Sequence, residues 1–461
     1  MHYEKFADGS VKCIEDEIPF ELPKGWTWAR LSMVAEAIGD GDHQPPPQTS
    51  SGIPFLVISN VSEGTLSFEN TRCVCEDYYA NLPETRKPRN GDLLFTVTGS
   101  YGIPVVVDTD NKFCFQRHIA IIRPCIISNH YLHIVLGSPY VKSICDEKAT
   151  GTAQKTVGLA TLRELLIPVA PYTEQMRIYV RTEAALNIVN SVISDKEDLQ
   201  NILKITKAKI LDMAIHGQLV PQDPDDEPAS ILLARIREEK EALIKQGKIK
   251  RDKKESIIFR GDDNSYYRRS LNGEEDVTDD LPYTIPDSWE WTTIGELFAI
   301  NPRNKLADDI DVSFIPMPLI DDGYSGCHRS LTKQWKDIKT GFTHFQNGDI
   351  GLAKITPCFE NRKSVIFKDL CNGFGAGTTE LHVLRPQSEA VLPEYALALL
   401  KSENFICSGV QAFTGAVGQQ RVGKDYVMNS YFPLPPHAEQ LRIVERIKKM
   451  FILISGIEAA L

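Results

Sequence analysis

An internal repeat restricts the fold of this chain more than any other feature of its sequence. The segment IPFELPKGWTW at 18–28 returns as LPYTIPDSWEW at 281–291. Three further segments return in the same order, roughly 260 residues later: NGDLLF at 90–95 as NGDIGL at 347–352, HIAIIRP at 118–124 as ELHVLRP at 380–386, and IPVAPYTEQMRI at 167–178 as FPLPPHAEQLRI at 432–443. Four matches in one order predict two similar domains with insertions in their loops.

Each copy starts as a mixed domain of strands and helices. Short apolar runs rich in β-branched residues and bounded by Gly, Pro and Asn predict strands. Such runs lie at 55–59, 104–107 and 119–123 in the first copy, and at 364–367 and 381–385 in the second. A short helix is predicted after them, around 131–145 and 393–405. The fold class is α+β, with two similar mixed α/β domains.

Both copies end in a heptad pattern that predicts a long helix. Prolines at 168 and 171, and at 433, 435 and 436, end the strand region and start each helix. One helix cannot bury an apolar seam alone, so we predict an antiparallel intramolecular coiled coil, with pseudo-two-fold symmetry, that separates the two domains. The predicted seam consists of Ile178, Val189, Val192, Leu199, Leu203 and Ile210 in the first helix and Ile443, Ile447, Met450, Ile454 and Ile457 in the second.

The predicted organisation therefore has five parts. The first domain covers 1–170, its long helix 171–217, a linker with a helix and a basic run 218–264, the second domain 265–435, and the second long helix 436–461. The basic run KIKRDKK at 248–254 is a solvated surface or a contact to DNA or a partner. Leu461 corresponds to Lys196, so the distal part of the first helix is expected to lack a partner segment, as in a truncated protein.

Composition excludes several classes of protein. Acidic residues within the first twenty positions exclude a signal peptide, and no apolar run is long enough to span a bilayer. We therefore expect a cytoplasmic protein without membrane contact. The ten cysteines form no CxxC pair or Cys/His cluster, which predicts reduced thiols and no metal site. A net charge of −11 opposes unaided DNA binding, although a local basic face can still hold a phosphate backbone.

The sequence gives no sign of catalysis. It has no GxxxxGK[ST] loop, and the glycines of NGFGAGTT at 372–379 precede a strand instead of opening a helix. Asn301-Pro302 is followed by Arg303, where a methyltransferase that flips an amino-bearing base needs Pro and an aromatic residue. We predict a non-catalytic protein that binds no cofactor.

The repeated elements resemble the specificity subunits of type I restriction-modification systems. The resemblance is carried by LPKGWTWARL at 22–31, GTAQKTVGLATL at 151–162, PYTEQMRI at 171–178, AIHGQLVPQDPDDEPASILLARI at 214–236 and GDIGLAKITPCFENRKSVIF at 348–367. It implies two target-recognition domains that each read half of a split DNA site, with helices that set their distance. It also implies two methyltransferase subunits as partners, which bind S-adenosylmethionine, and a restriction subunit that uses ATP for translocation.

Sequence readout needs donors and acceptors that reach base edges, together with cations on phosphates. On that basis the candidate DNA-binding residues are Thr98, Ser100, Tyr101, Lys112, Gln116, Arg117, His118, Gln154 and Lys155 in the first domain, and Lys354, Asn361, Arg362, Lys363, Gln419, Gln420 and Arg421 in the second. The four repeated tryptophans are expected to pack in cores rather than stack on bases. Two alternatives stay open: a stand-alone DNA-binding regulator, and a coiled-coil scaffold that binds no nucleic acid.

Overall fold

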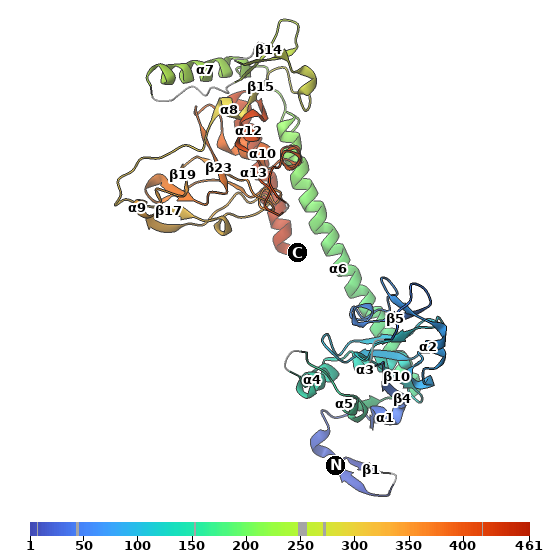
Figure 1. The fold of residues 1–461 in the computed structure, drawn as a ribbon. Helices are drawn as coiled ribbons and strands as arrows, with labels where there is room; N and C mark the ends of the chain where they lie inside the picture. The colour runs from blue at the N-terminus through green and yellow to red at the C-terminus, as the bar shows by residue number, and fades with distance from the viewer. Residues whose placement is uncertain (7, 43–45, 152–153, 248–255, 271–272, 417) are drawn as a thin grey trace. The chain divides into compact units, whose positions relative to one another are not determined.

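The computed structural model describes all residues except 7, 43–45, 152–153, 248–255, 271–272 and 417 (Figure 1). The chain divides into two compact units, Met1–Ile193 and Ser194–Leu461. The basic run predicted to contact DNA or a partner, at 248–254, lies outside the described residues. No helix in the described part of the chain combines the length and apolar character that crossing a membrane requires.

Unit 1 is built on a four-stranded antiparallel sheet in the order β4-β10-β7-β8. Its strands are Ala35–Asp40, Ile119–Pro124, Leu93–Thr96 and Pro104–Val106. The smaller sheets are β6-β5-β9 (Arg72–Val74, Ile53–Leu56, Cys114–Phe115), β3-β11 (Thr27–Arg30, Leu166–Val169) and the hairpin β1-β2 (Tyr3–Lys5, Val11–Cys13). The helices are α1 (Leu31–Val34), α2 (Glu76–Ala80), α3 (Asn129–Leu136), α4 (Pro139–Lys148) and α5 (Leu159–Glu164).

Unit 2 repeats this plan. Its sheet β16-β23-β20-β21 consists of Phe298–Ile300, Leu381–Pro386, Ile350–Ala353 and Ser364–Ile366. The other sheets are β18-β17-β22-β19 (Leu331–Gln334, Asp311–Ile315, Phe374–Gly377, Thr343–Gln346), β15-β24 (Glu290–Thr293, Tyr431–Leu434) and β12-β13-β14 (Ile257–Arg260, Tyr266–Ser270, Gly273–Asp276). The helices are α7 (Ala229–Lys245), α8 (Ile294–Leu297), α9 (Trp335–Ile338), α10 (Pro393–Leu400), α11 (Glu403–Gln411), α12 (Lys424–Asn429) and α13 (His437–Ala460). The mixed α/β class is thereby confirmed.

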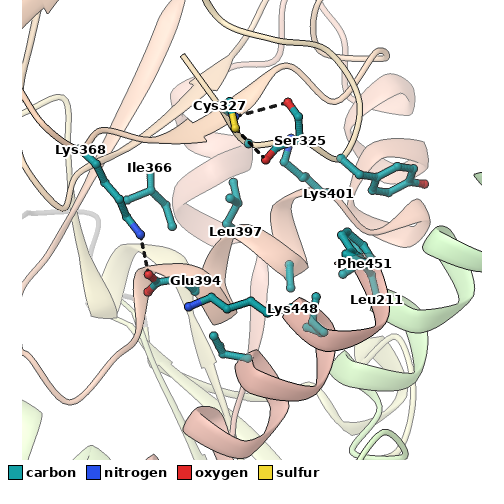
Figure 2. Close-up of a pocket in the computed structure, with 15 residues that line it drawn as sticks. Leu211, Ser325, Cys327, Ile366, Lys368, Glu394, Leu397, Lys401, Lys448 and Phe451 are labelled. Carbon is teal, nitrogen blue, oxygen red and sulfur yellow. Dashed lines mark hydrogen bonds and ion pairs between the residues drawn. The ribbon is translucent and has the colours of Figure 1, made fainter. Parts of the chain in front are cut away.

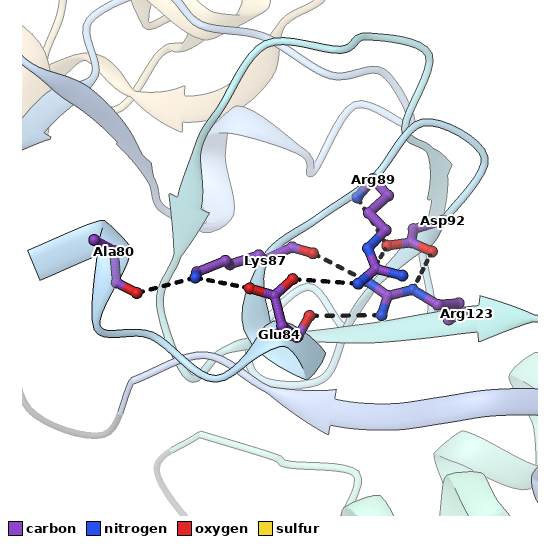
Figure 3. A network of polar contacts seen from close by, with 6 residues as sticks. All are labelled: Ala80, Glu84, Lys87, Arg89, Asp92 and Arg123. Carbon is purple, nitrogen blue, oxygen red and sulfur yellow. Dashed lines mark hydrogen bonds and ion pairs between the residues drawn. The ribbon is translucent and has the colours of Figure 1, made fainter. Parts of the chain in front are cut away.

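The repeated NGD and Arg-Pro motifs form an ion pair in each unit. Arg123 donates from Nε and Nη2 to the two carboxylate oxygens of Asp92, at 3.0 and 2.9 Å. Arg385 binds Asp349 in the same way, at 2.9 and 2.7 Å. Arg123 also donates to the carbonyl of Lys87, which ties a surface loop to the sheet (Figure 3). These motifs therefore recur because they hold two sheet strands and a turn together.

The repeated EQ motif fastens each long helix to its own globule. Gln175 accepts from the backbone N–H of Ser128 and donates to the carbonyl of Ala170, both at 2.8 Å. Gln440 accepts in the same way from Leu392, at 2.9 Å. Trp289 and Trp291 are fully buried, Trp26 packs against the core of unit 1, and Trp28 contacts the rings of Phe20 and Tyr140. The packing role expected for them is confirmed for the second pair.

The helices predicted around 131–145 and 393–405 are each split into two. Gly137 and Ser138 separate α3 from α4, and Ser402 lies between α10 and α11. In both cases the serine hydroxyl accepts from the backbone N–H three residues later, which is the N-cap of a new helix. The apolar pattern continues across the break, so the pattern alone does not reveal it.

The long helix is present as α6, which extends over 44 residues from Tyr172 to Ile215. Within unit 2, Leu203 and Ile210 of α6 pack with Ile454 of α13 in one apolar cluster, flanked by Leu199, Ile447 and Met450. Lys196 donates to the carbonyl of Leu461, and Lys207 pairs with Glu458 at 2.7 Å. Because a residue further along α6 contacts a residue earlier in α13, these two segments are antiparallel.

The predicted pairing does not extend along the whole seam in the described residues. Ile178 and Ile443 pack against the cores of their own units, because each helix starts directly on its globule. Val189 and Val192 are 52% and 60% exposed, and Ile457 is 46% exposed. Every residue at 184–198 is exposed. A heptad pattern thus identifies a helix face that can be covered, but not what covers it.

Candidate nucleic-acid interface

One end of the main sheet is built in the same way in both units. The residue after β7 lies beside the residue before β10 in unit 1, and the residue after β20 lies beside the residue before β23 in unit 2. In unit 1, the N–H of Val97 donates to the carbonyl of His118 at 2.9 Å, and Val157 donates to Val97 at 2.8 Å. In unit 2, Lys354 donates to Glu380 at 3.0 Å, and Val422 donates to Lys354 at 2.8 Å. Three segments far apart in the sequence therefore meet at one end of each four-stranded sheet.

A short hairpin borders this edge in both units. Thr150 and Thr156 exchange two backbone hydrogen bonds of 3.0 and 2.8 Å, and Thr414 and Arg421 exchange two of 3.0 and 2.9 Å. The residue after the first strand position is a glycine each time, Gly151 at φ +112° and its counterpart at 415 at φ +111°. Only glycine adopts this backbone readily, so the residue that follows the first strand position has the same conformation in both units. We call the edge and its hairpin the recognition edge.

Most candidates of the first domain lie at the recognition edge of unit 1. Thr98 and Thr156 are joined by a hydrogen bond of 3.2 Å between their hydroxyls, and Gly99 donates to the carbonyl of Lys155. Gln116, Arg117 and His118 immediately precede β10 on the neighbouring strand. The exposed side chains among these candidates are Ser100, Arg117, Gln154 and Lys155.

Two candidates of the first domain are already engaged, and one lies elsewhere. Thr98 is buried. The Tyr101 hydroxyl donates to Asp146 at 2.8 Å, and the ammonium of Lys142 lies 4.0 Å from the centre of its ring. Lys112 is exposed between β8 and β9, and no contact among the described residues joins it to the recognition edge.

His118 is partly buried at the recognition edge. Loss of water lowers the pKa of its imidazole below the usual value, and the neighbouring Arg117 lowers it further. The ring is therefore neutral near pH 7, with one nitrogen that donates and one that accepts a hydrogen bond. It suits a base edge better than a phosphate.

The recognition edge of unit 2 carries a charge pair. Arg421 donates from Nε and Nη2 to the two carboxylate oxygens of Glu380, at 2.8 and 3.0 Å. The hydrogen bonds from Arg421 hold the pKa of Glu380 below its ordinary value. The backbone N–H of Lys354 donates to Glu380, and Gln419 and Gln420 directly precede Arg421 in the sequence. Donors and acceptors of both charges are thus concentrated at one edge.

Asn361, Arg362 and Lys363 lie in the turn between β20 and β21, and their side chains differ in availability. Arg362 donates to the carbonyl of Lys401 at 3.0 Å and pairs with Glu403. Lys363 pairs with Asp322 at 3.1 Å. These two cations are only 12% and 13% exposed, whereas Asn361 is exposed. In this conformation both charges face neighbouring elements of unit 2.

Two residues at this end of unit 2 are absent from the sequence-based candidates. Glu380 occupies the position of His118 in the repeat, and that correspondence could have identified it. Arg303 lines a cavity of about 280 Å³ with Asn301, His344 and Lys354. It follows Asn301-Pro302, a dipeptide that sequence reasoning considered only as a methyltransferase motif.

A second cavity, of about 320 Å³, lies away from the recognition edge among α10, α13 and the end of α6 (Figure 2). Its wall is largely apolar, with Leu211, Leu397 and Phe451, and Lys401 lies at its border. The Lys401 ammonium donates to the carbonyls of Gly323 and Arg362, at 2.5 and 2.8 Å. Burial lowers the pKa of Lys401 to about 7.

Metal-ligating side chains are not grouped in the described ranges. No set of three or more His, Cys, Asp or Glu there could hold an ion. All ten cysteines are free thiols, five of them exposed.

Curated proteins with similar sequences are specificity subunits. The chain is 47% identical over 266 residues to the type I restriction enzyme EcoAI specificity subunit of Escherichia coli, which covers 58% of this chain and 42% of that protein. It is 44% identical over 264 residues to the EcoEI specificity subunit, also of Escherichia coli, with 57% and 41% covered. The chain thus spans less than half the length of these relatives. No protein-family model matches it.

Solved structures share the fold at low sequence identity. A structure of a type I R-M system superposes with a TM-score of 0.63 at 16% identity, and covers 96% of this chain and 94% of that one. The HsdS subunit of Thermoanaerobacter tengcongensis gives a TM-score of 0.51 at 17% identity, with 96% and 93% covered. The chain is therefore similar in sequence, over more than half of its length, to type I restriction enzyme specificity subunits, and it shares the fold of the solved structures over nearly all of its length.

Proposed function

We propose that this chain selects the DNA site of a type I restriction-modification complex and does no chemistry itself. The observation that supports this most is the recognition edge, which both units build with the same backbone hydrogen bonds and different side chains. A constant frame with variable donors and acceptors suits two domains that read two different half-sites of one duplex.

Each side chain at the recognition edge has a chemical role in this proposal. Arg117, Lys155 and Lys354 hold phosphates, and His118 and the glutamines bind base edges. Glu380 and Arg421 can exchange their mutual hydrogen bonds for bonds to a base pair, since a carboxylate accepts from cytosine N4 and a guanidinium donates to guanine. The ion pair keeps both groups ordered before DNA binds.

The partners follow from the same proposal. Two methyltransferase subunits bind S-adenosylmethionine and transfer the methyl group, and a restriction subunit hydrolyses ATP, translocates DNA and cleaves it. The chain itself would hold neither cofactor. The complex acts on double-stranded DNA in the cytoplasm.

The long helices serve as a spacer in this proposal. Leu203, Ile210 and Ile454 would form part of an antiparallel coiled coil, and the exposed stretch at 184–198 would lie between the two recognition domains. The domain boundaries at 170, 217, 264 and 435 then separate parts that read DNA from parts that set distance.

A gel-shift titration at several salt concentrations tests the proposal, with the chain alone and with its methyltransferase partners. We expect weak binding by the chain alone and tight, sequence-selective binding by the complex. Tight binding by the chain alone supports a stand-alone regulator, and no binding in either state supports a scaffold. The single chain should transfer no methyl group when supplied with S-adenosylmethionine.

A further inference from the structure

The linker that follows α6 makes polar contacts with α13, the helix that begins with the repeated EQ motif of unit 2. Gln222 donates to one carboxylate oxygen of Glu439 at 2.6 Å, and the indole N–H of Trp289 donates to the other at 2.9 Å. Asp226 accepts two hydrogen bonds from Arg442, at 3.0 and 2.5 Å. The linker thereby satisfies two charged groups of α13.

The helix α7 continues this docking with an apolar face. The N–H of Ala229 donates to the carbonyl of Ser288 at 2.9 Å, just before β15. Ala229, Leu232, Leu233 and Ile236 are all buried in the cluster that contains Trp289. Arg237 of α7 pairs with Glu296 at 2.6 Å, and Glu296 is only 2% exposed.

Unit 1 has residues that correspond to this binding site, but among the described residues no such segment covers them. Glu174 and Arg177 of α6 correspond to Glu439 and Arg442, and Trp26 corresponds to Trp289. Among the residues that the structure describes, the carboxylate of Glu174, the guanidinium of Arg177 and the indole N–H of Trp26 have no hydrogen-bond or ion-pair partner. Trp26 is half-buried where its counterpart is fully buried. Met33, at the position of Glu296, is 62% exposed.

We propose that this face of unit 1, formed by Trp26, Met33, Glu174 and Arg177, binds a polypeptide segment with the chemistry of residues 216–245. Such a segment carries a Gln and an Asp four residues apart, followed by an amphipathic helix with small and branched apolar residues. The Gln amide then binds Glu174, the Asp carboxylate binds Arg177, and the helix covers Trp26 and Met33. The interface already made in unit 2 is the template, and the inference does not rest on DNA recognition.

A labelled peptide of residues 216–247 tests this on the full chain by fluorescence anisotropy. We expect saturable binding with one peptide per chain. Arg177→Ala, an exposed position, should weaken the Kd at least tenfold, as should Asp226→Ala in the peptide. Arg181→Ala is the matched control, because it removes an exposed arginine one turn further along α6 and should leave the Kd unchanged.

A second variant separates binding to unit 1 from exchange with the chain's own linker in unit 2. Peptide binding should persist in Arg442→Ala, which weakens only the binding site of unit 2. Binding that survives Arg177→Ala but is lost in Arg442→Ala overturns the proposal, and so does the absence of saturable binding. Equal loss in Arg177→Ala and Arg181→Ala also overturns it, since attraction would then depend on charge alone.

Discussion

Arg421 and Glu380 lie where the two recognition edges differ most in charge, since Thr156 and His118 hold the corresponding positions in unit 1. Both unit 2 groups are within reach of solvent, and their pairing fixes two long side chains that would otherwise adopt many rotamers. Side chains held in place before binding lose less entropy when they contact DNA. The frame around them is the same in both units, so specificity is expected to reside in such differences.

Replacing Arg421 by Ala is expected to weaken DNA binding by the assembled complex about 10- to 100-fold, which corresponds to about 1–3 kcal/mol for a base contact. Recognition in the second half-site should relax and the first half-site should stay unchanged. The measurement combines binding titrations with sequencing of the methylated motif. Lys336→Ala removes an exposed cation of α9 and serves as the control. Unchanged affinity and motif in Arg421→Ala would assign the ion pair a structural role.

Lys401 gives a prediction about pH. Its pKa is about 7 in the folded chain because of burial, well below the value of 10.5 for a free lysine. Between these two values the unfolded chain binds more protons, so the free energy of unfolding rises with pH. Relative to Lys401→Met, the parent chain should gain up to about 1.4 kcal/mol per pH unit from pH 7 to 10. Denaturant titrations at several pH values measure this, and parallel curves for the two proteins would contradict it.

At the scale of elements, the two halves of α6 have different surroundings. Leu203 is 6% exposed and packs with α13, whereas Val189 is 52% exposed on the same predicted seam. Contact with another helix, and not the heptad position as such, determines how much each residue contributes to stability.

Leu203→Ala should therefore lower the free energy of unfolding of unit 2 by about 2–5 kcal/mol, as expected for a buried leucine. Val189→Ala should change it by less than about 0.5 kcal/mol, as expected for an exposed position. Urea titrations of the full chain compare the two variants. A similar loss of stability in both would mean that the whole seam is covered in solution.

The sequence predicted the elements better than it predicted the partners of their side chains. The repeat identified the two domains' shared motifs because NGD, Arg-Pro and EQ each need a specific bonding partner inside the domain. Charge type was a poorer guide to the DNA-binding surface: Arg362 and Lys363 are cations in a loop, yet both are paired with carboxylates far away in the sequence. Glu380 was not predicted because it is an anion, although the cation that it binds, Arg421, is among the predicted residues.

At the scale of the whole molecule, the spacer hypothesis predicts an effect of helix length on the DNA site. One heptad inserted between Asn190 and Ser191 keeps the seam in register, and leaves the contacts of Leu199 and Leu203 in place. It lengthens α6 by about 10 Å at 1.5 Å per residue. With about 3.4 Å per base pair, the spacer between half-sites should grow by up to about three base pairs.

Sequencing the motif methylated by the complex that carries the insertion measures this length. Both half-site sequences should be unchanged, because the insertion touches no residue of either recognition edge. An active complex with an unaltered spacer would show that α6 does not set the distance.

The stretch at 184–198, in which every residue is exposed, also determines where a protease cleaves the chain. A helix that buries no side chain is marginal in water at this length, and its backbone opens far more often than that of either core. A protease needs an opened backbone, so limited digestion should cut first within this stretch and release fragments close to Met1–Ile193 and Ser194–Leu461. Any protein that covers the helix will slow that cut, which makes the rate of cleavage a direct report of when the chain is assembled with its partners.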